Sequence, residues 1–536
     1  MIAPTGIYPV KEVPYEGRRR ASPLLWALGV AAVVPAAIPI AYLVWIVVRP
    51  GGFDAGGFSA ERLLELLGAT TLLAVTVTIA TAGLGLATAW ITTRTDLPAA
   101  RVWSTLVTIP LVIPSYVGAM TMLAASGNNG MISQFLVFLG LPPLPVFQGF
   151  WAAWAALSLW NFSFVHLLTV PVLRRLDPAL EEASRGLGAG RWKTLRTIVL
   201  PQLRPALASS SLLVALYVIS EFGAVSMLRY ETFTRAIYTQ FGGRPDPTPA
   251  LFLAGLLVIG ALFIVLIQQR ARGKVALYSN RPTRAVTPVS LGRRGRVGAW
   301  AFLGTLTTFA LILPMTTLVW WAVRGLALGN TPLSVLPHAV KSLSVSALAA
   351  IVIVLAAIPV SILAVRHPGI RSRALESTAW LTYSLPHLAI GLGFLVLAVR
   401  IARPIYQTLT LLVIAYLAMF LPQAMAALES GLGRIGPHLE DASRSLGVGS
   451  WATLRRVTIP MIRRSVLAGA ALVFLSAMKE LPATLLLRPT EFDTLPIRIW
   501  SATSELFYTQ ASFASLTLIA VSFVPLYLFV ARDLHE

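Results

Sequence analysis

Long apolar segments alternate along this chain with short polar ones. A membrane-spanning helix needs about 20 predominantly apolar residues, and each of these segments is long enough. The first six lie at approximately 24–48, 63–91, 102–125, 146–173, 206–228 and 249–269. Six more lie at approximately 297–323, 342–365, 375–399, 407–428, 465–487 and 511–531. The pattern therefore predicts an all-α polytopic membrane protein with about twelve transmembrane helices.

Composition agrees with this fold class and narrows the chemistry. Of the 536 residues, 56% are hydrophobic and only 12% are charged, whereas a soluble domain has about 25% charged residues. The chain has no cysteine, which excludes disulfides, thiolate metal sites and cysteine nucleophiles. Its six histidines show no metal-ligand spacing: His166 lies in a span, and His387 follows Pro386. We therefore expect ordinary hydrogen-bonded histidines and no metalloenzyme.

The positive charges are unevenly distributed between alternate loops. The formal net charge is +21, and cations concentrate in the segments 174–205, 270–296 and 429–464, whereas 126–150 carries no charge at all. Cytoplasmic loops of membrane proteins carry such an excess of Lys and Arg. The pattern predicts that both termini are cytoplasmic, and it explains the basic balance without nucleic acid as a partner.

A repeat at an offset of 259 residues divides the chain into two halves. The segment Glu181–Trp192 returns as Glu440–Trp451 with most positions identical or similar. Because each half has an even number of spans, the second half enters the membrane in the same orientation as the first. We expect two parallel, pseudo-symmetric six-helix halves with a pathway between them. The predicted divisions are a tail (1–20), a first half (21–270), a basic linker (271–296) and a second half (297–536).

The repeated segment resembles a known motif. Residues 182–201 resemble the EAA loop of ABC importer permeases, in which an acid, two small residues and a glycine precede an Ile-x-Leu-Pro sequence. Here these are Glu182-Ala183-Ser184, Gly188 and Ile198-Val199-Leu200-Pro201, and the second copy departs slightly, with Asp441, Val457 and Ile459. The resemblance implies the membrane domain of a type I ABC importer, in which these loops dock on an ATPase. The implied coupling residues are Glu181, Glu182, Ala183, Ser184, Gly188, Glu440, Asp441, Ala442, Ser443 and Gly447.

A narrower resemblance concerns the substrate. The segments 220–234 and 479–489 are similar to parts of fused ferric-iron permeases. This implies import of ferric iron by alternating access, with an extracytoplasmic iron-binding protein as a partner. Fused thiamin permeases share the arrangement, so another small substrate such as thiamin is the alternative. An ion-coupled secondary transporter also uses parallel repeats, but it has no reason to keep the paired loops.

Energy has to come from another polypeptide. The chain lacks G-x-x-x-x-G-K-[ST], the loop that holds nucleotide phosphates. We expect it to be no enzyme and to bind no cofactor itself, with ATP and Mg on a partner ATPase dimer. We also expect the protein to lie in the lipid bilayer of the cytoplasmic (inner) membrane.

One acid falls within the fifth span of each half. Glu221 and Glu480 are related by the 259-residue offset, and each is followed eight residues later by an arginine, Arg229 or Arg488. An acid at this depth costs about 2.5–3.5 kcal/mol on insertion scales, so it faces a cavity or a partner. We interpret both glutamates and both arginines as lining the substrate pathway, with the carboxylates as transient metal ligands. Structural pairing is the alternative, since Lys479 shows that this span tolerates charge. Met227 and Met478 nearby are expected to pack.

Overall fold

The computed structural model describes residues 21–51, 57–271, 288–435 and 438–533, and these segments are almost entirely helical. The helices of the first half are α1 (Pro23–Val48), α3 (Ala60–Arg94), α4 (Ala100–Thr108), α5 (Ser115–Ala125), α6 (Met131–Phe138), α7 (Phe150–Arg175), α8 (Pro178–Gly186), α9 (Arg191–Thr194), α10 (Leu200–Ser220), α11 (Gly223–Met227), α12 (Phe233–Gly243) and α13 (Thr248–Ala271). Those of the second half are α14 (Gly292–Thr307), α15 (Leu313–Ala327), α16 (Leu336–Arg366), α17 (Ile370–Tyr383), α18 (His387–Arg400), α19 (Leu409–Arg434), α20 (His438–Ser445), α21 (Ser450–Thr453), α22 (Ile459–Met461), α23 (Arg463–Met478), α24 (Pro482–Leu487), α25 (Leu495–Ser504) and α26 (Tyr508–Asp533).

The prediction of an all-α membrane protein is confirmed. Within the described residues, eight helices are long and apolar enough to cross a membrane, and three bent helix pairs raise the number to eleven. The twelfth predicted range is covered by α26. The third span of each half is bent by about a right angle, 91° between Ala100–Val112 and α5, and 106° between α17 and α18. Each bend falls at a proline, Pro114 or Pro386, which caps the following helix and disfavours helical geometry in the residue before it.

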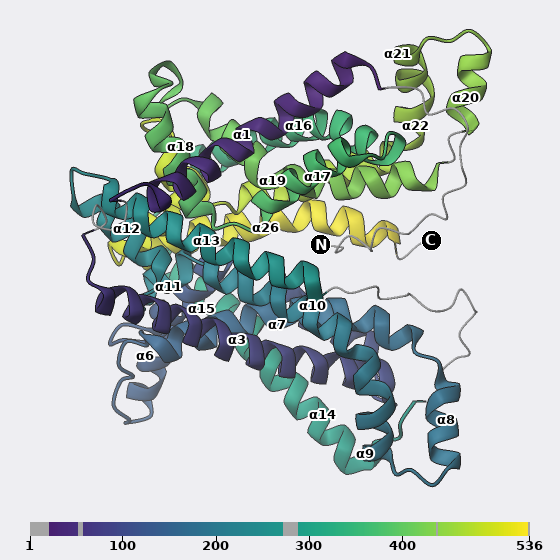
Figure 1. Ribbon diagram of the computed structural model, residues 1–536. Coiled ribbons are helices and arrows are strands. Elements are labelled where there is room, and N and C mark those ends of the chain that lie inside the picture. Colours follow the sequence, from purple (N-terminus) through teal and green to yellow (C-terminus); the bar gives the residue numbers. More distant parts are fainter. Residues whose placement is uncertain (1–20, 52–56, 272–287, 436–437, 534–536) are drawn as a thin grey trace.

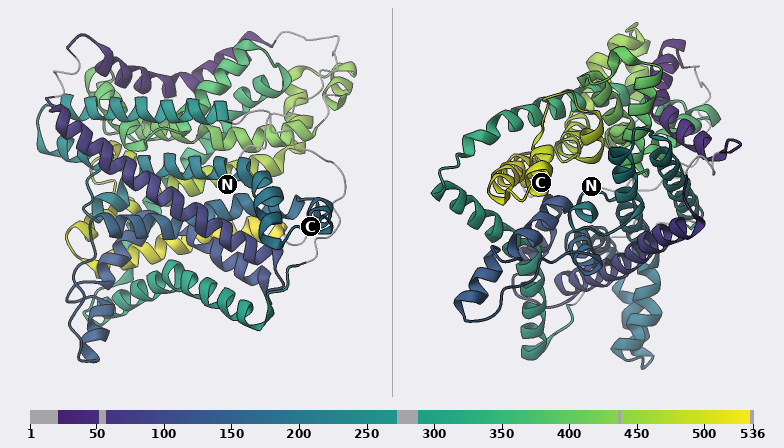
Figure 2. Two further views of the ribbon diagram at one scale, coloured as in Figure 1. Left: turned by 60° about the horizontal axis from the view of Figure 1, so that its bottom comes forward. Right: turned by 90° about the vertical axis from the view of Figure 1, so that its left-hand side faces the viewer.

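The two halves exchange their first helices. Helix α1 packs on α13 of its own half but also on α16, α17, α18 and α19 of the second half, while α14 and α15 pack on α4 and α5 of the first. The same exchange appears in the apolar core, where Ala36 and Leu43 of α1 share one cluster with Ile353 of α16 and Leu421 of α19. Figure 2 shows α1 (purple) lying along the green helices of the second half in both views. The halves are therefore repeats in sequence but interlocked units in space.

The end of the linker is attached to the first half. Residues 272–287 of the predicted linker lie outside the described structure, as does the predicted tail 1–20, but Val289 forms an isolated parallel bridge with Thr95. The Asp96 carboxylate accepts hydrogen bonds from the Leu291 amide at 2.9 Å and from Arg296 at 2.6 Å. The hydrogen bond from Arg296 lowers the pKa of Asp96 below its ordinary value. Helix α14 begins at Gly292, inside the range predicted as linker.

The repeated loops lie at two far corners of one side of the molecule. We call residues 177–204 the first repeat loop and 436–463 the second repeat loop. Figure 1 shows α8 and α9 at one corner and α20 and α21 at the other, both on the side opposite to α6 and α12. The repeat loops therefore share one membrane face, as the even number of spans in each half predicts.

Candidate functional site

A buried ion pair fixes each repeat loop to the second span of its own half. In the first repeat loop Glu181 is 7% exposed and pairs with Arg94, the last residue of α3. In the second, Glu440 is 8% exposed and accepts from Nε of Arg366 at 3.3 Å and from its Nη2 at 3.2 Å. Arg366 is the last residue of α16. Each repeat loop is therefore tied by an ion pair to the end of a long span.

The opposite face of each loop helix is open. Glu182 and Ala183 are exposed on α8, as is Ala442 on α20; the side chain of Asp441 lies outside the described residues. Each helix also ends in an uncovered leucine: Leu187 is 89% exposed and Leu446 is 84% exposed. An acid beside exposed apolar side chains is a typical composition for a protein-binding surface. The first acid of each loop thus faces inward, whereas the outward face remains available to a partner.

The turn after each loop helix is built in the same way twice. Gly188 has φ +83° and Gly447 has φ +81°, which is the left-handed conformation that favours glycine. Across the turn, the Ser184 and Thr194 hydroxyls lie 3.1 Å apart, and those of Ser443 and Thr453 lie 3.0 Å apart. The structure therefore gives the repeated Ser and Gly positions a role in holding the shape of the loop.

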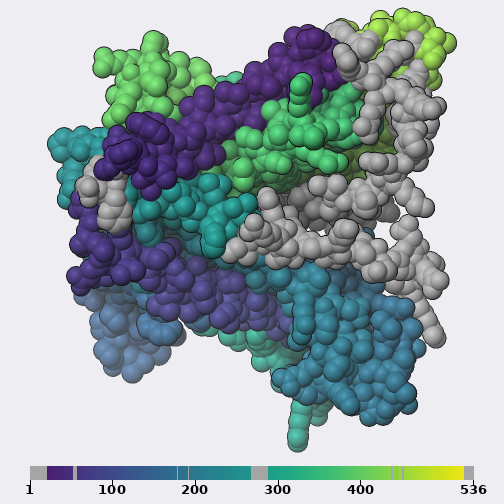
Figure 3. All heavy atoms as spheres, in the orientation of Figure 1, coloured from purple at the N-terminus to yellow at the C-terminus, as the bar shows by residue number. Residues whose placement is uncertain are grey.

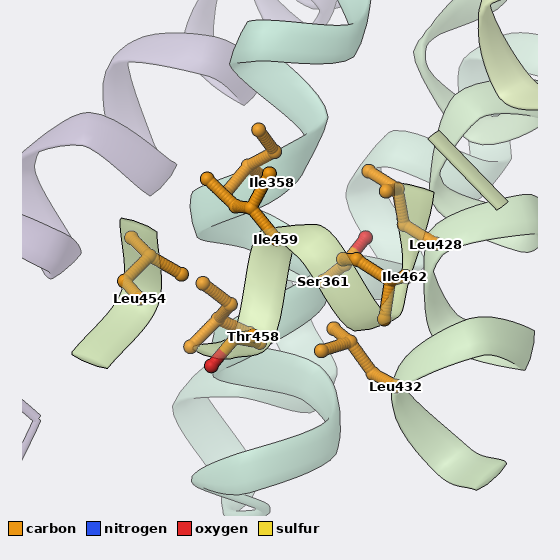
Figure 4. Close-up of a pocket in the computed structure, with 9 residues that line it drawn as sticks. Ile358, Ser361, Leu428, Leu432, Leu454, Thr458, Ile459 and Ile462 are labelled. Atoms are coloured by element: carbon orange, nitrogen blue, oxygen red, sulfur yellow. The ribbon is translucent and has the colours of Figure 1, made fainter. Parts of the chain in front are cut away.

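Each repeat loop contains a π-helical turn after its glycine turn, at Leu195–Val199 and Leu454–Thr458. In the second half this turn packs against α16 and α19 around a cavity of about 10 Å³. Figure 4 shows Leu454, Thr458 and Ile459 facing Ile358 and Leu432 across it. A cavity this small and apolar has no room for a ligand. The Thr458 hydroxyl donates to Glu440 at 3.2 Å, so the turn also supports the buried ion pair.

Glu221 lies at a break in the fifth span. Helix α10 ends at Ser220, and the Glu221 carboxylate accepts from the Ala224 amide at 2.9 Å, which caps the short helix α11. The Ser115 hydroxyl donates to the same carboxylate at 3.0 Å. Tyr217 in turn donates to Ser115 at 3.0 Å. Ser115 is the first residue of α5, directly after the bend at Pro114, so two interrupted spans meet at this acid.

Glu480 repeats the construction in the second half. It lies between α23 and α24, and its carboxylate accepts from the Ala483 amide at 3.1 Å. Nδ1 of His387 lies 2.8 Å from Oε2 of Glu480. His387 is the first residue of α18 after Pro386, just as Ser115 follows Pro114. The sequence analysis did not identify Ser115 and His387 as partners of the two glutamates. The proline that directly precedes each of them in the third span could have indicated them.

The helix breaks at Glu221 and Glu480 lie close to each other, at a contact between the two halves of the chain. The Tyr116 hydroxyl donates to the carbonyl oxygen of Lys479 at 3.4 Å. A Cβ added at Gly223 would lie 2.7 Å from the Cβ of Tyr116 and 3.3 Å from Leu481. Packing this close needs glycine there, and it brings the residues next to Glu221 against those next to Glu480. Glu221 and Glu480, one from each half, therefore flank this contact between the halves.

The two arginines are not the partners of these acids. Arg229 is exposed beyond the end of α11, with φ +56°. Arg488 pairs with Asp493. None of the ion pairs within the described residues joins either arginine to Glu221 or Glu480. Met227 and Met478 are buried in the apolar core, as expected. In the same described part of the chain, no group of three or more acids and histidines could hold a metal ion, and Glu221 and Glu480 are both buried, 8% and 6% exposed.

Comparison with known proteins agrees with this architecture. The family model described as "Binding-protein-dependent transport system inner membrane component" matches residues 79–274 and 354–532, more than half of the chain. The chain is 31% identical over 471 residues to "Fe(3+)-transport system permease protein FbpB 2" of Haemophilus influenzae, covering 87% of this chain and 90% of that protein.

More distant relatives match over different lengths. "Ferric transport system permease protein FbpB" of Actinobacillus pleuropneumoniae is 24% identical, with 81% of this chain and 67% of that protein covered. "Sulfate transport system permease protein CysT" of Salmonella typhimurium is 35% identical over only 29% of this chain and 55% of that protein. A crystal structure of a bacterial ABC transporter that imports alginate covers 47% of this chain and 96% of the solved chain, with 19% identity and a TM-score of 0.40. The chain belongs to the family of binding-protein-dependent transport system inner membrane components.

Proposed function

We propose that this chain is the permease subunit of an ATP-driven importer that moves ferric iron into the cytoplasm. The observation that carries the proposal is the pair of repeat loops, each held by an ion pair and each with an exposed leucine, with the acid Glu182 exposed beside it on the first loop. Both iron-related relatives align over more than four fifths of the chain, whereas the sulfate-related one aligns over less than a third. This full-length likeness favours iron over thiamin.

In this proposal the partners divide the work. An ABC ATPase dimer binds ATP and Mg and docks on α8 and α20, the termini of the permease face the cytoplasm, and an extracytoplasmic iron-binding protein delivers the cargo to the opposite side. Closure of the ATPase draws the two loops together. The ion pairs Arg94–Glu181 and Arg366–Glu440 pass that movement to α3 and α16. Rocking of the halves then opens the region around Glu221 and Glu480 alternately to each side.

The two carboxylates supply the chemistry that a ferric ion needs during passage. Their oxygens are hard ligands suited to this ion. Each acid also holds hydrogen bonds from a backbone amide and a side chain, so its position is fixed before the ion arrives. Two ligands from a protein wall bind an ion weakly, and weak binding lets the ion leave again.

The test is uptake into proteoliposomes that contain the permease and its ATPase, with the iron-loaded binding protein outside. We expect ATP-dependent accumulation of radioactive iron and no accumulation of thiamin. Uptake of thiamin instead of iron would overturn the substrate. Uptake that follows an ion gradient without ATP would overturn the importer class in favour of a secondary transporter.

A further inference from the structure

An open crevice separates α1 from α17 near the end of the molecule that carries the repeat loops. It has a volume of about 420 Å³, within the roughly 300–1,000 Å³ typical of ligand pockets. Trp26, Val30 and Val34 line it from α1, and Arg371, Leu375 and Thr378 line it from α17. Figure 3 shows the face on which α1 (purple) lies across the green helices of the second half. The lining is apolar except for Thr378 and one cation, Arg371.

The crevice is bounded by a close helix contact. A Cβ added at Gly29 would lie 2.8 Å from Leu363 and 3.1 Å from Leu375. Glycine therefore lets α1 touch α16 and α17 at this point. Beside the contact, Val30 and Val34 remain 44% exposed because no side chain of α17 covers them. The space is thus a gap beside a tight junction, open to the bilayer.

The pseudo-equivalent place in the first half is filled. Between Arg94/Arg366 and Pro114/Pro386 the two halves align at an offset of 272 positions, which pairs Trp103 with Leu375. Trp103 packs in an apolar cluster with residues of α14, including Leu303 and Leu306. The same alignment pairs Ala99 with Arg371. The second half therefore has both the cation and the crevice at this place, whereas the equivalent place in the first half has an alanine and is filled by Trp103.

The chemistry of the crevice fits one kind of molecule. Arg371 is exposed at the start of α17, and no ion pair among the described residues involves it. Guanidinium groups bind phosphate through paired hydrogen bonds, and apolar walls at membrane depth accept an acyl chain. We propose that the crevice binds an anionic phospholipid, with its acyl chain between α1 and α17 and its phosphate on Arg371. Only one part of this inference rests on the proposed function, namely that the lipid belongs to the cytoplasmic leaflet.

Native mass spectrometry of the purified full-length chain tests the site. The protein is incubated with palmitoyl-oleoyl phosphatidylglycerol or with the zwitterionic phosphatidylcholine of the same chains, and the retained lipid is counted. We expect tighter retention of phosphatidylglycerol, and about fivefold weaker retention in Arg371→Gln, as loss of one cation near a membrane surface predicts. Leu375→Trp fills the crevice from α17, as Trp103 does in the first half, and should abolish the retention.

Two further variants keep the result clear. Val34→Phe narrows the crevice from α1 and should also abolish retention of the lipid. It therefore tests the crevice independently if Leu375→Trp folds poorly. Arg101→Gln removes an exposed cation from the equivalent segment of the first half, where Trp103 packs against α14, and should leave retention unchanged. Equal retention of the two lipids by the wild type, or full retention by both filling variants, would overturn the proposal. Because no step of this assay requires transport, its failure is distinguishable from failure of the importer proposal.

Discussion

In the proposed importer, Glu221 and Glu480 each combine two tasks in one side chain. Each carboxylate caps a short helix through a backbone amide, and each accepts a second hydrogen bond from the third span of its half. Capping requires only an acceptor oxygen, which glutamine also offers. Attraction of a cation requires the negative charge. Replacement by glutamine therefore separates the structural task from the transport task.

We expect Glu221→Gln with Glu480→Gln to lower iron uptake by at least about tenfold, equivalent to about 1.4 kcal/mol of lost attraction. Protein yield and basal ATP hydrolysis should change little, because the caps survive. Each single variant should have a smaller effect. Uptake, detergent thermostability and basal ATPase activity are measured on the same three proteins. Glu231→Gln, which removes a partly exposed acid just before α12 that pairs with Arg62 and Arg235, is the matched control.

Structural pairing gives the opposite ranking. If the carboxylates served only to balance buried partners such as His387, thermostability would fall first, by about 3–5 kcal/mol for a broken buried pair. Undiminished uptake in the double variant would remove both residues from the pathway.

The sequence located these two acids but not their surroundings. Their common offset of 259 and their depth were visible, because identical residues mark identical positions. Ser115 and His387 were not, since their side chains differ and the offset there is 272. The change arises because the segment around α6 makes the first half longer between the third and fourth spans. A polar partner that changes type and register between repeats leaves no periodic signal.

At the scale of elements, the inward and outward faces of α8 and α20 call for separate experiments. The inward face holds the buried ion pairs, and the outward face presents Glu182 and the exposed leucines. The loop helices were predictable from their start signals and glycines. The division between their two acids was not, because adjacent residues on a helix point in different directions and only the packing against α3 or α16 decides which one is buried.

Glu182→Lys with Asp441→Lys should release the ATPase or uncouple it while the membrane domain stays folded, since both positions lie outside the apolar spans. The measurement is co-purification of the ATPase together with iron uptake. Asp246→Lys, on the loop before α13, changes an exposed acid at the far end and serves as the control. Normal co-purification and normal uptake in the double variant would refute the docking assignment.

Arg94→Ala with Arg366→Ala should act differently. Loss of the tethers leaves the outward faces intact, so the ATPase should still bind, but its movement should no longer reach α3 and α16. We expect iron transported per ATP hydrolysed to fall several-fold, since each broken buried pair costs about 3–5 kcal/mol. Arg185→Ala removes the exposed second partner of Glu181 and should cost about 0–1 kcal/mol. An unchanged ratio of iron to ATP would show that the tethers do not transmit the movement.

At the scale of the whole molecule, the exchanged first helices predict how a divided chain behaves. Co-expressed fragments 1–287 and 288–536 should associate and transport iron, because α1 and α14 hold the halves together across the cut. A first fragment that begins at residue 57 lacks α1 and should associate much more weakly. The measurements are affinity co-purification and uptake. Equal association with and without α1 would contradict the exchange.

Sequence periodicity supplied the spans but not the exchange. Every span has an apolar surface whichever neighbour it meets, so α1 carries no mark that its neighbours belong to the second half. The bends of the two third spans were not predicted either, although Pro114 and Pro386 are visible in the sequence. A hydropathy pattern measures how much surface is apolar, whereas partner choice depends on the shapes of particular side chains such as Gly29 against Leu363.

The exchange also sets an order of events during synthesis. The main neighbours of α1 begin with α13 at the end of the first half and continue with α16 in the second. At roughly 5–20 residues per second, ribosomes need on the order of half a minute to make the intervening chain. During that time α1 lies in the bilayer without these neighbours. Its small residues Gly29, Ala32 and Ala36, which are buried in the folded protein, then face lipid. A nascent chain truncated before α16 should therefore leave α1 accessible to the quality-control proteases of the membrane.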